Sequence, residues 1–414
     1  MAVDWRPSTW GEEISLEYGK SLRNYDKSRG SYRVFGSNGP IGWTDKPLTA
    51  GPGIILGRKG AYRGVEFTLS PFFVIDTAYY VVPKSELDMR WLYYAIKYHK
   101  LGEIDDGSPI PSTTRAAVYV RELQIPPLSE QRAIASILGS LDDKIELNRR
   151  MNETLEGIAR ALFKSWFVDF DPVRAKMDGQ QPNGMSPQIA NLFPSEFEHV
   201  NGELVPKGWR QSLLANEIGF QGGFAFKSKD WQEEGVPVVK IGSVKPGIID
   251  LDQVSFVSEE IAIQASRYRL GVGDLLIGMT GYVGEVGIVP PAQLLPLLNQ
   301  RVGKFVLSTP GTSSLGFWYC TTRRQEFRSF VEGRSHGTAQ ANVSASAIME
   351  YPLVLPSPLI LHRFNSVSAP VFDRILDNHG QMRMLASLRD TLLPKLLSGE
   401  LRVPEADKML EEVL

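Results

Sequence analysis

Two stretches of the chain place their seam residues at alternating steps of four and three, and the second stretch repeats the first 230 residues later. This spacing is typical of a coiled coil, in which each helix presents one stripe of residues to a partner. Both stretches therefore predict long helices. The seam positions are Ile134, Leu138, Leu141, Ile145, Asn148, Asn152, Leu155, Ala159 and Leu162 in the first stretch, and Phe364, Ser368, Val371, Ile375, Asn378, Met382, Leu385, Arg389 and Leu392 in the second.

Local sequence signals predict where the two helices begin and end. Ser129 suits an N-cap, and the pattern continues to about Val168, which predicts roughly 40 residues and about 60 Å of helix. The second helix is expected to begin at Ser357 and Pro358. It is expected to kink or end at Pro394, because proline lacks the amide hydrogen that a helix interior requires.

An asparagine stands at the same seam position in both stretches, Asn148 and Asn378. A side-chain amide in an apolar seam costs stability unless it finds a partner, and it is tolerated where it fixes the register. We therefore expect the two helices to pack on each other within the chain, in antiparallel orientation. The alternative is that each helix packs on its own domain and that both asparagines are solvated.

Short apolar runs bounded by glycine and proline occupy residues 11–125 and about 208–355. Such runs predict buried strands. A short helix is expected from Trp91, with a counterpart from Phe317, and residues 172–206 are predicted to be an irregular crossing segment. The clearest strand candidates are 53–57, 72–75, 236–241, 273–278 and 303–307.

These elements predict an α+β fold with two mixed, mostly β domains, separated by two long helices that pack as an antiparallel intramolecular coiled coil. The globular parts match each other only in short strips, 53–64 with 273–284 and 107–112 with 337–342. The predicted boundaries are 1–125 for the first β domain, 126–171 for the first long helix, 172–355 for the crossing segment and second β domain, 356–403 for the second long helix, and 404–414 for a tail.

Composition and charge narrow the class of protein. The hydrophobic content of 43% is typical of a folded chain, and the net charge of −2 gives no global argument for a polyanionic partner. Cys320 is the one cysteine, which excludes a disulfide within the chain. We find neither an export signal nor an apolar run long enough for a membrane span, so a cytoplasmic location with no membrane contact is expected.

No catalytic motif emerges from the sequence. The five histidines are scattered without metal-ligand spacing, and the glycine-rich strips near Gly51 and Gly281 lack the spacing of a dinucleotide site. The sequence also lacks a recognisable methyltransferase motif and a convincing nuclease carboxylate cluster. We therefore expect no enzyme activity, no metal and no cofactor.

Basic and polar residues gather in loops that recur at corresponding positions of the two halves. Residues 57–64 hold three cations, one aromatic residue and no acid, and their glycines let the backbone approach a phosphate closely. Arginine can also read guanine, and asparagine or glutamine adenine. For any single residue an ordinary solvated loop is the alternative. The predicted DNA-binding residues are Arg58, Lys59, Tyr62, Arg63, Ser112, Thr113 and Arg115 in the first half, and Lys240, Thr280, Tyr282, Arg323, Arg324, Arg334, Gln340 and Asn342 in the second.

Several motifs resemble the specificity subunit of type I restriction-modification systems, over nearly the whole chain. They are Ile125-Pro-Pro-Leu-Ser-Glu-Gln-Arg-Ala-Ile-Ala, Asp142-Asp-Lys-Ile-Glu-Leu-Asn, Leu162-Phe-Lys-Ser-Trp-Phe-Val-Asp-Phe-Asp-Pro-Val, Val205-Pro-Lys-Gly-Trp and Leu392-Leu-Pro-Lys-Leu-Leu-Ser-Gly-Glu-Leu. The resemblance implies two target-recognition domains, each reading half of a split, asymmetric site in double-stranded DNA. It implies two conserved helices that set the length of the unread spacer. It also implies two docked methyltransferase (M) subunits, added restriction/translocase (R) subunits for cleavage, and no catalytic site in this chain.

One motif of the resemblance is present only once. Glu130 and Gln131 open the first helix, and together with Asn148 and Asn378 they are predicted to serve partner docking or the helix seam. The start of the second helix lacks this Glu-Gln pair, which puts equal docking at the two helix starts in doubt.

Two other hypotheses stay open at this point. A coiled-coil scaffold with two protein-binding heads would have no affinity for DNA even with its partners present. An enzyme with an unrecognised site, such as a nuclease, would show metal-dependent activity as an isolated chain.

Overall fold

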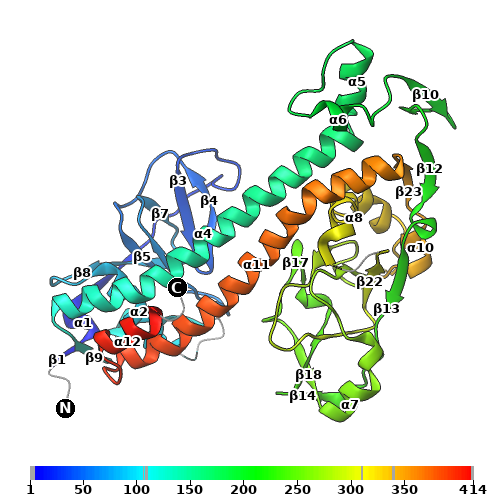
Figure 1. Cartoon of the computed structure of the whole chain (residues 1–414). Coiled ribbons are helices and arrows are strands. Elements are labelled where there is room, and N and C mark those ends of the chain that lie inside the picture. Colours follow the sequence, from blue (N-terminus) through cyan, green and yellow to red (C-terminus); the bar gives the residue numbers. More distant parts are fainter. Residues whose placement is uncertain (1–4, 106, 108–110, 309–310, 338–340, 412–414) are drawn as a thin grey trace. The chain divides into compact units, whose positions relative to one another are not determined.

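The computed structural model describes residues 5–105, 107, 111–308, 311–337 and 341–411. The chain divides into two compact units (Figure 1): unit 1 comprises residues 1–145 and 384–414, and unit 2 comprises residues 146–383. Each unit contains part of both long helices, α4 (Leu128–Phe167) and α11 (Pro358–Leu397), which have 40 residues each. The two predicted long helices are therefore confirmed.

Unit 1 centres on a four-stranded sheet with the order β2-β8-β5-β6, accompanied by a three-stranded sheet, β4-β3-β7, and the pair β1-β9. The middle strand β5 is buried along its whole length, as its unbroken apolar sequence predicts. The strands are β1 (Arg6–Thr9), β2 (Ile14–Tyr18), β3 (Tyr32–Gly36), β4 (Gly39–Thr44), β5 (Gly53–Gly57), β6 (Val65–Thr68), β7 (Phe72–Val74), β8 (Ala78–Pro83) and β9 (Glu122–Ile125). The shorter helices are α1 (Trp10–Glu13), α2 (Met89–Tyr98), α3 (Arg115–Tyr119) and α12 (Val403–Glu411).

Unit 2 centres on a six-stranded sheet with the order β13-β22-β19-β20-β17-β16, next to a four-stranded sheet, β14-β18-β15-β21, and the pairs β10-β11 and β12-β23. Its strands are β10 (Phe197–Val200), β11 (Glu203–Pro206), β12 (Arg210–Leu213), β13 (Gly219–Gly222), β14 (Trp231–Gln232), β15 (Val236–Val239), β16 (Val244–Lys245), β17 (Gly247–Ile249), β18 (Ser255–Val257), β19 (Leu275–Gly278), β20 (Val286–Ile288), β21 (Leu297–Leu298), β22 (Val302–Val306) and β23 (Pro352–Leu355). Its shorter helices are α5 (Asp171–Met177), α6 (Pro187–Ala190), α7 (Glu259–Gln264), α8 (Leu315–Thr322), α9 (Gln325–Glu332) and α10 (Ala345–Met349).

The two units resemble each other more closely in fold than in sequence. The antiparallel order β2-β8-β5-β6 of unit 1 corresponds to the antiparallel order β13-β22-β19-β20 of unit 2, and the pair β1-β9 corresponds to β12-β23. Helices α3 and α10 follow at the same offset as the long helices. The fold class predicted from the sequence, with mostly β domains joined to antiparallel long helices, is confirmed.

Segments of α4 and α11 pack in antiparallel orientation within each unit (Figure 1). In unit 2, Asn148 Nδ2 donates to Gln381 Oε1 at 3.1 Å, and Asn378 Nδ2 donates to Asn152 Oδ1 at 2.8 Å. The partner's number falls as the α4 number rises, as antiparallel pairing requires. Both predicted seam asparagines are buried, so the alternative of solvated amides is wrong.

Two expectations about chain geometry are wrong. Helix α11 continues through Pro394 to Leu397, because Leu396 and Leu397 bury their side chains in the core of unit 1 and outweigh the lost hydrogen bond. The helix ends at Leu397, and Gly399 just beyond it has a φ of 74°, which suits the residue that follows a helix C-cap. The crossing segment 172–206 is not irregular, since it contains α5, α6 and the β10-β11 hairpin. None of the helices in the described ranges has the length and apolar character needed to span a membrane.

Candidate nucleic-acid interface

In unit 1, two loops that are far apart in sequence meet beside the buried strand β5. The loop after β5 bridges to the segment before α3 at Lys59 and Ser112. Gly60 N donates to the Pro111 carbonyl at 3.0 Å, and Thr113 N donates to the Arg58 carbonyl at 2.9 Å. The segments that the sequence predicted to bind DNA therefore form one loop pair.

Unit 2 repeats this loop pair with the same hydrogen-bond register. The loop after β19 bridges to the segment before α10 at Thr280 and Asn342. Gly281 N donates to the Ala341 carbonyl and Val343 N donates to the Met279 carbonyl, both at 2.9 Å. The side chains join as well, because Thr280 Oγ1 lies 2.9 Å from Asn342 Oδ1. Gln340, also predicted to read DNA, lies outside the described residues.

Each loop pair presents an exposed tyrosine. The side chain of Tyr62 is 78% exposed in unit 1, and that of Tyr282 is 61% exposed in unit 2. Lys59 and Asn342 are exposed beside them. Aromatic rings of this size are normally buried, so the loops display apolar surface together with cations and amides. Such a surface suits binding to the backbone and edges of a nucleic acid.

A cluster of arginine and tyrosine lies next to the first loop pair. The guanidinium groups of Arg58 and Arg115 lie 5.0 and 4.2 Å from the ring centre of Tyr18. Arg115 Nε also donates to the Leu16 carbonyl at 2.6 Å, which fixes the stack. Burial raises the pKa of neighbouring Tyr79 to about 12, so its hydroxyl stays protonated. Sequence reasoning missed Tyr18, which contacts the arginines only because β2 and β5 both lie beside β8.

Two predicted DNA-binding residues of unit 1 make hydrogen bonds inside the unit. The Arg63 guanidinium donates to the main-chain carbonyls of Gly60, Gly102 and Ile104 at 2.7, 2.9 and 3.0 Å. Thr113 is fully buried, and its hydroxyl donates to the carbonyls of Leu101 and Ile104. Both side chains supply the donors that the carbonyls of residues 101–104 beneath the loop require.

The basic run of unit 2 is mostly paired inside the unit. Arg323, 15% exposed, lies 2.9 Å from Glu285 and 3.6 Å from Glu156, so its charge is already paired within the unit. Arg324 pairs with Glu326 at 3.0 Å. These pairs could not be predicted from sequence, because Glu156 and Glu285 are remote from Arg323 along the chain.

The remaining two cations predicted in unit 2 stack on aromatic rings. Lys240 Nζ lies 3.7 Å from the ring centre of Trp231, and burial lowers the pKa of Lys240. Arg334 lies 3.5 Å from the ring centre of Phe330 and 3.8 Å from a carboxylate oxygen of Glu350. Arg334 is exposed, so it stays a candidate contact.

The Glu-Gln pair that opens α4 holds unit 1 together. Gln131 is 2% exposed, its Oε1 accepts from Asp88 N and its Nε2 donates to the Pro126 carbonyl, both at 2.9 Å. Glu130 accepts hydrogen bonds from Trp5 Nε1 at 3.1 Å and from Arg402 at 3.3 Å. A docking partner therefore has no access to the Gln131 side chain.

The missing Glu-Gln pair in the second helix has a structural reason. The corresponding positions of α11 are Ile360 and Leu361, and both pack in the apolar core of unit 2. Because neither residue is charged, this helix start needs no counterpart of Arg402, which pairs with Glu130 in unit 1.

A basic segment that follows β2 and extends into the start of β3 was not predicted from the sequence. Residues 20–33 hold five cations and one acid, Asp26, and all five cations are exposed. Arg33 lies 4.5 Å from the ring centre of half-exposed Trp43. The charge imbalance alone was a sufficient signal. The cations are Lys20, Arg23, Lys27, Arg29 and Arg33.

Both loop pairs are equipped for binding. The first pair offers cations, a hydroxyl and an aromatic ring, and the second offers hydroxyls, an amide and an aromatic ring, all at exposed or half-buried positions. Within the described part of the chain, no group of three His, Cys, Asp or Glu side chains is placed to hold a metal ion.

Comparison with known proteins identifies the class. A family model for the type I restriction modification DNA specificity domain matches residues 4–157. The HindI specificity subunit of Haemophilus influenzae is 29% identical, over 83% of this chain and 84% of its own length. The MjaIX specificity subunit of Methanocaldococcus jannaschii is 27% identical, over 96% and 88%. The crystal structure of a type I restriction-modification S subunit from M. genitalium has the same fold, with a TM-score of 0.59 at 18% identity over 95% of this chain and 96% of that one.

Residues 4–157 therefore match a DNA specificity domain, and the chain has the fold of the M. genitalium S subunit. Over most of its length the chain is similar to type I restriction enzyme specificity subunits, and together the family model and these relatives support a specificity subunit. The resemblance seen in the sequence is confirmed, and similarity to specificity subunits fits a non-catalytic role.

Proposed function

We propose that this chain is the DNA-recognition subunit of a type I restriction-modification complex and that each of its two loop pairs reads one half of a split site. The carrying observation is the loop pair itself, which recurs in both units with the same hydrogen-bond register while its side chains differ. Lys59 in one unit stands where Thr280 stands in the other. A repeated framework with different exposed groups suits the recognition of two different base sequences.

The DNA-contact surface in this proposal differs from the one expected from sequence. In unit 1 it comprises Arg58, Lys59, Tyr62, Ser112 and Arg115, joined by Tyr18 and the basic segment 20–33. In unit 2 it comprises Lys240, Thr280, Tyr282, Arg324, Arg334 and Asn342. Phosphate contacts by the lysines and arginines supply affinity, and the polar loop residues discriminate bases.

We further propose that methyltransferase subunits dock on the exposed faces of the long helices and supply the catalysis, with two such subunits per chain and restriction subunits added for cleavage. Leu147 and Ile158 support this assignment, because both are half-exposed on α4. They stand 11 residues apart, which is about three helical turns and places them on one face. With genomic DNA as its target, the complex acts in the cytoplasm.

The recognition proposal is tested by mapping methylated adenines in cells that express the chain with its cognate methyltransferase. We expect one bipartite, asymmetric motif with an unread gap, and no methylation or cleavage by the purified chain alone. A continuous motif would refute the split-site proposal. Absence of DNA affinity in the purified complex would favour the protein-binding scaffold instead.

The docking proposal is tested by the double substitution Leu147→Asp with Ile158→Asp. We expect the full-length chain to stay folded, since both side chains face solvent, and to lose co-purification with the methyltransferase. The matched control is Leu69→Asp with Leu204→Asp, which places the same charges on exposed leucines away from α4. Unchanged co-purification of the α4 variant would move the docking surface elsewhere.

A further inference from the structure

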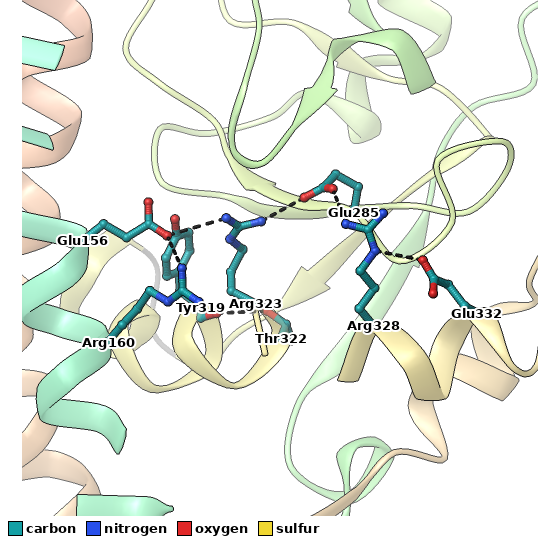
Figure 2. A network of polar contacts seen from close by, with 8 residues as sticks. All are labelled: Glu156, Arg160, Glu285, Tyr319, Thr322, Arg323, Arg328 and Glu332. Carbon is teal, nitrogen blue, oxygen red and sulfur yellow. Dashed lines mark hydrogen bonds and ion pairs between the residues drawn. The ribbon is translucent and has the colours of Figure 1, made fainter. Parts of the chain in front are cut away.

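A buried carboxylate anchors the reading loop of unit 2. Glu285 directly follows the loop that carries Thr280 and Tyr282, and it is 7% exposed. Gly278 N donates to the Glu285 carbonyl at 2.8 Å, which closes the loop at its base. The Glu285 carboxylate receives Arg323 at 2.9 Å and Arg328 at 3.0 Å (Figure 2). A carboxylate this buried requires such partners.

Arg323 extends the anchor to the long helix. One terminal nitrogen of its guanidinium bonds to Glu285, and the other lies 3.6 Å from Glu156 on α4 (Figure 2). Arg160, one turn along α4, also lies 3.6 Å from Glu156. The loop is therefore connected to α4 through one planar side chain that spans two carboxylates.

In unit 1 the equivalent loop is anchored by an arginine inside the loop, whereas in unit 2 the anchor is a carboxylate at the base of the loop. The base of that loop is closed by Gly57 N donating to the Gly64 carbonyl at 2.9 Å, so Gly64 stands where Glu285 stands in unit 2. The charged anchor lies inside the loop, where Arg63 donates to the carbonyls of Gly60, Gly102 and Ile104. Each loop is thus fixed by its own guanidinium, with different partners.

These loops need an anchor because their backbones are rich in glycine. Gly281 and Gly284 have φ values of 74° and 79°, in the left-handed region, and Gly60 has 113°. Glycine leaves many backbone conformations open. Discrimination between bases requires the reading groups to be held close to one geometry.

We propose that Arg323 with Glu285, and Arg63 in the other unit, are positioning residues that determine specificity, each for one half-site only. They act through the loops that carry Thr280 and Tyr282, and Lys59 and Tyr62, without touching DNA. This inference rests on the proposed function. It assigns the two arginines, which the sequence suggested as DNA contacts, an indirect part in recognition.

The test uses the full-length chain co-expressed with its methyltransferase in cells that carry a plasmid library randomised in both half-sites. Arg323→Lys keeps the charge, but a single ammonium cannot span Glu285 and Glu156 in the same planar geometry. Glu285→Gln keeps a hydrogen-bond acceptor and removes the charge. Both variants are expected to lose at least tenfold in discrimination at the half-site read by unit 2, with the other half-site unchanged. Arg63→Lys is expected to lose discrimination at the half-site read by unit 1, with the half-site read by unit 2 unchanged.

The matched control is Glu332→Gln, which removes the charge of the exposed carboxylate that lies 2.8 Å from Arg328 and leaves Glu285 with both arginines. It should change neither half-site. Thermal unfolding of each purified complex accompanies the maps, and Arg323→Lys carries the test if Glu285→Gln does not fold.

Unchanged maps for Arg323→Lys and Arg63→Lys would overturn the inference, and so would equal loss at both half-sites. A wild-type map without a bipartite motif would instead refute the proposed function, so the two failures are distinguishable.

Discussion

Lys59 and Thr280 occupy the same position in the two loop pairs, and only the first carries a charge. Lys59→Ala is expected to weaken DNA binding by the chain-methyltransferase complex about equally across sequences. It should also reduce the slope of log affinity against log salt by about one, because one phosphate contact and its released counterion are lost. The measurement is fluorescence anisotropy over a salt series with cognate and scrambled duplexes.

Lys84 provides the control for this prediction. It follows β8 at the end remote from Thr77, whose carbonyl accepts from Lys59 N, and six strand residues separate the two sites by about 20 Å. Lys84→Ala should leave the salt slope unchanged. If Lys59→Ala abolishes a single base preference instead, Lys59 is a base reader.

His379 on α11 makes the stability of the chain depend on pH. Burial lowers the pKa of His379 from its ordinary 6.5 to about 4. Between pH 6.5 and about 4, His379 therefore binds a proton in the unfolded chain but stays neutral in the folded chain. This contribution to stability is complete above pH 6.5 and is lost as the pH falls towards 4, by up to about 3 kcal/mol.

Urea unfolding of the full chain at pH 7 and pH 5 measures this effect. His379→Gln should flatten the difference between the two pH values, whereas the same change at exposed His362 should not. An equal pH dependence in the wild-type chain and the His379→Gln variant would show that His379 is not the group responsible.

The helix seam depends on a buried amide pair. Asn378→Leu leaves Asn152 Oδ1 without the donor that now lies 2.8 Å away, which should cost about 1–3 kcal/mol of unfolding free energy. Adding Asn152→Leu should recover much of that loss, because two apolar side chains then meet in an apolar seam. Urea unfolding of the single and double variants distinguishes this from independent effects, in which the two losses simply add.

Elements with a strong periodic signal were predictable, and elements fixed by remote contacts were not. The seam positions predicted α4 and α11 because the spacing is a property of each helix by itself. The predicted kink or end at Pro394 was wrong because the rule for proline considers only the local backbone. It does not include the burial of Leu396 and Leu397 in the core of unit 1. The β10-β11 hairpin was missed because its segment is rich in turn-forming residues on both sides.

At the scale of the molecule, the position of the candidate site was predictable from the repeat, but the partners of its side chains were not. The sequence repeat predicted the positions of both loop pairs, because similar segments at corresponding positions of the two halves adopt similar structures. Composition alone cannot separate a cation that faces solvent from one that is paired. Arg63 and Arg323 look like Lys59 in sequence, yet carbonyls and carboxylates from remote segments occupy them.

The two long helices define the largest-scale prediction. Each crosses between the units, α4 at Ile145–Glu146 and α11 at Arg383–Met384. Seven helical residues inserted at both points keep the seam in phase and add about 10 Å, or about three base pairs of DNA. If the helices set the spacer, methylation mapping should show the same half-sites with a gap about three base pairs longer. Inserting the seven residues in α4 alone leaves them without a partner helix and should abolish methylation. An active double variant with an unchanged gap would refute the role of the helices as a ruler.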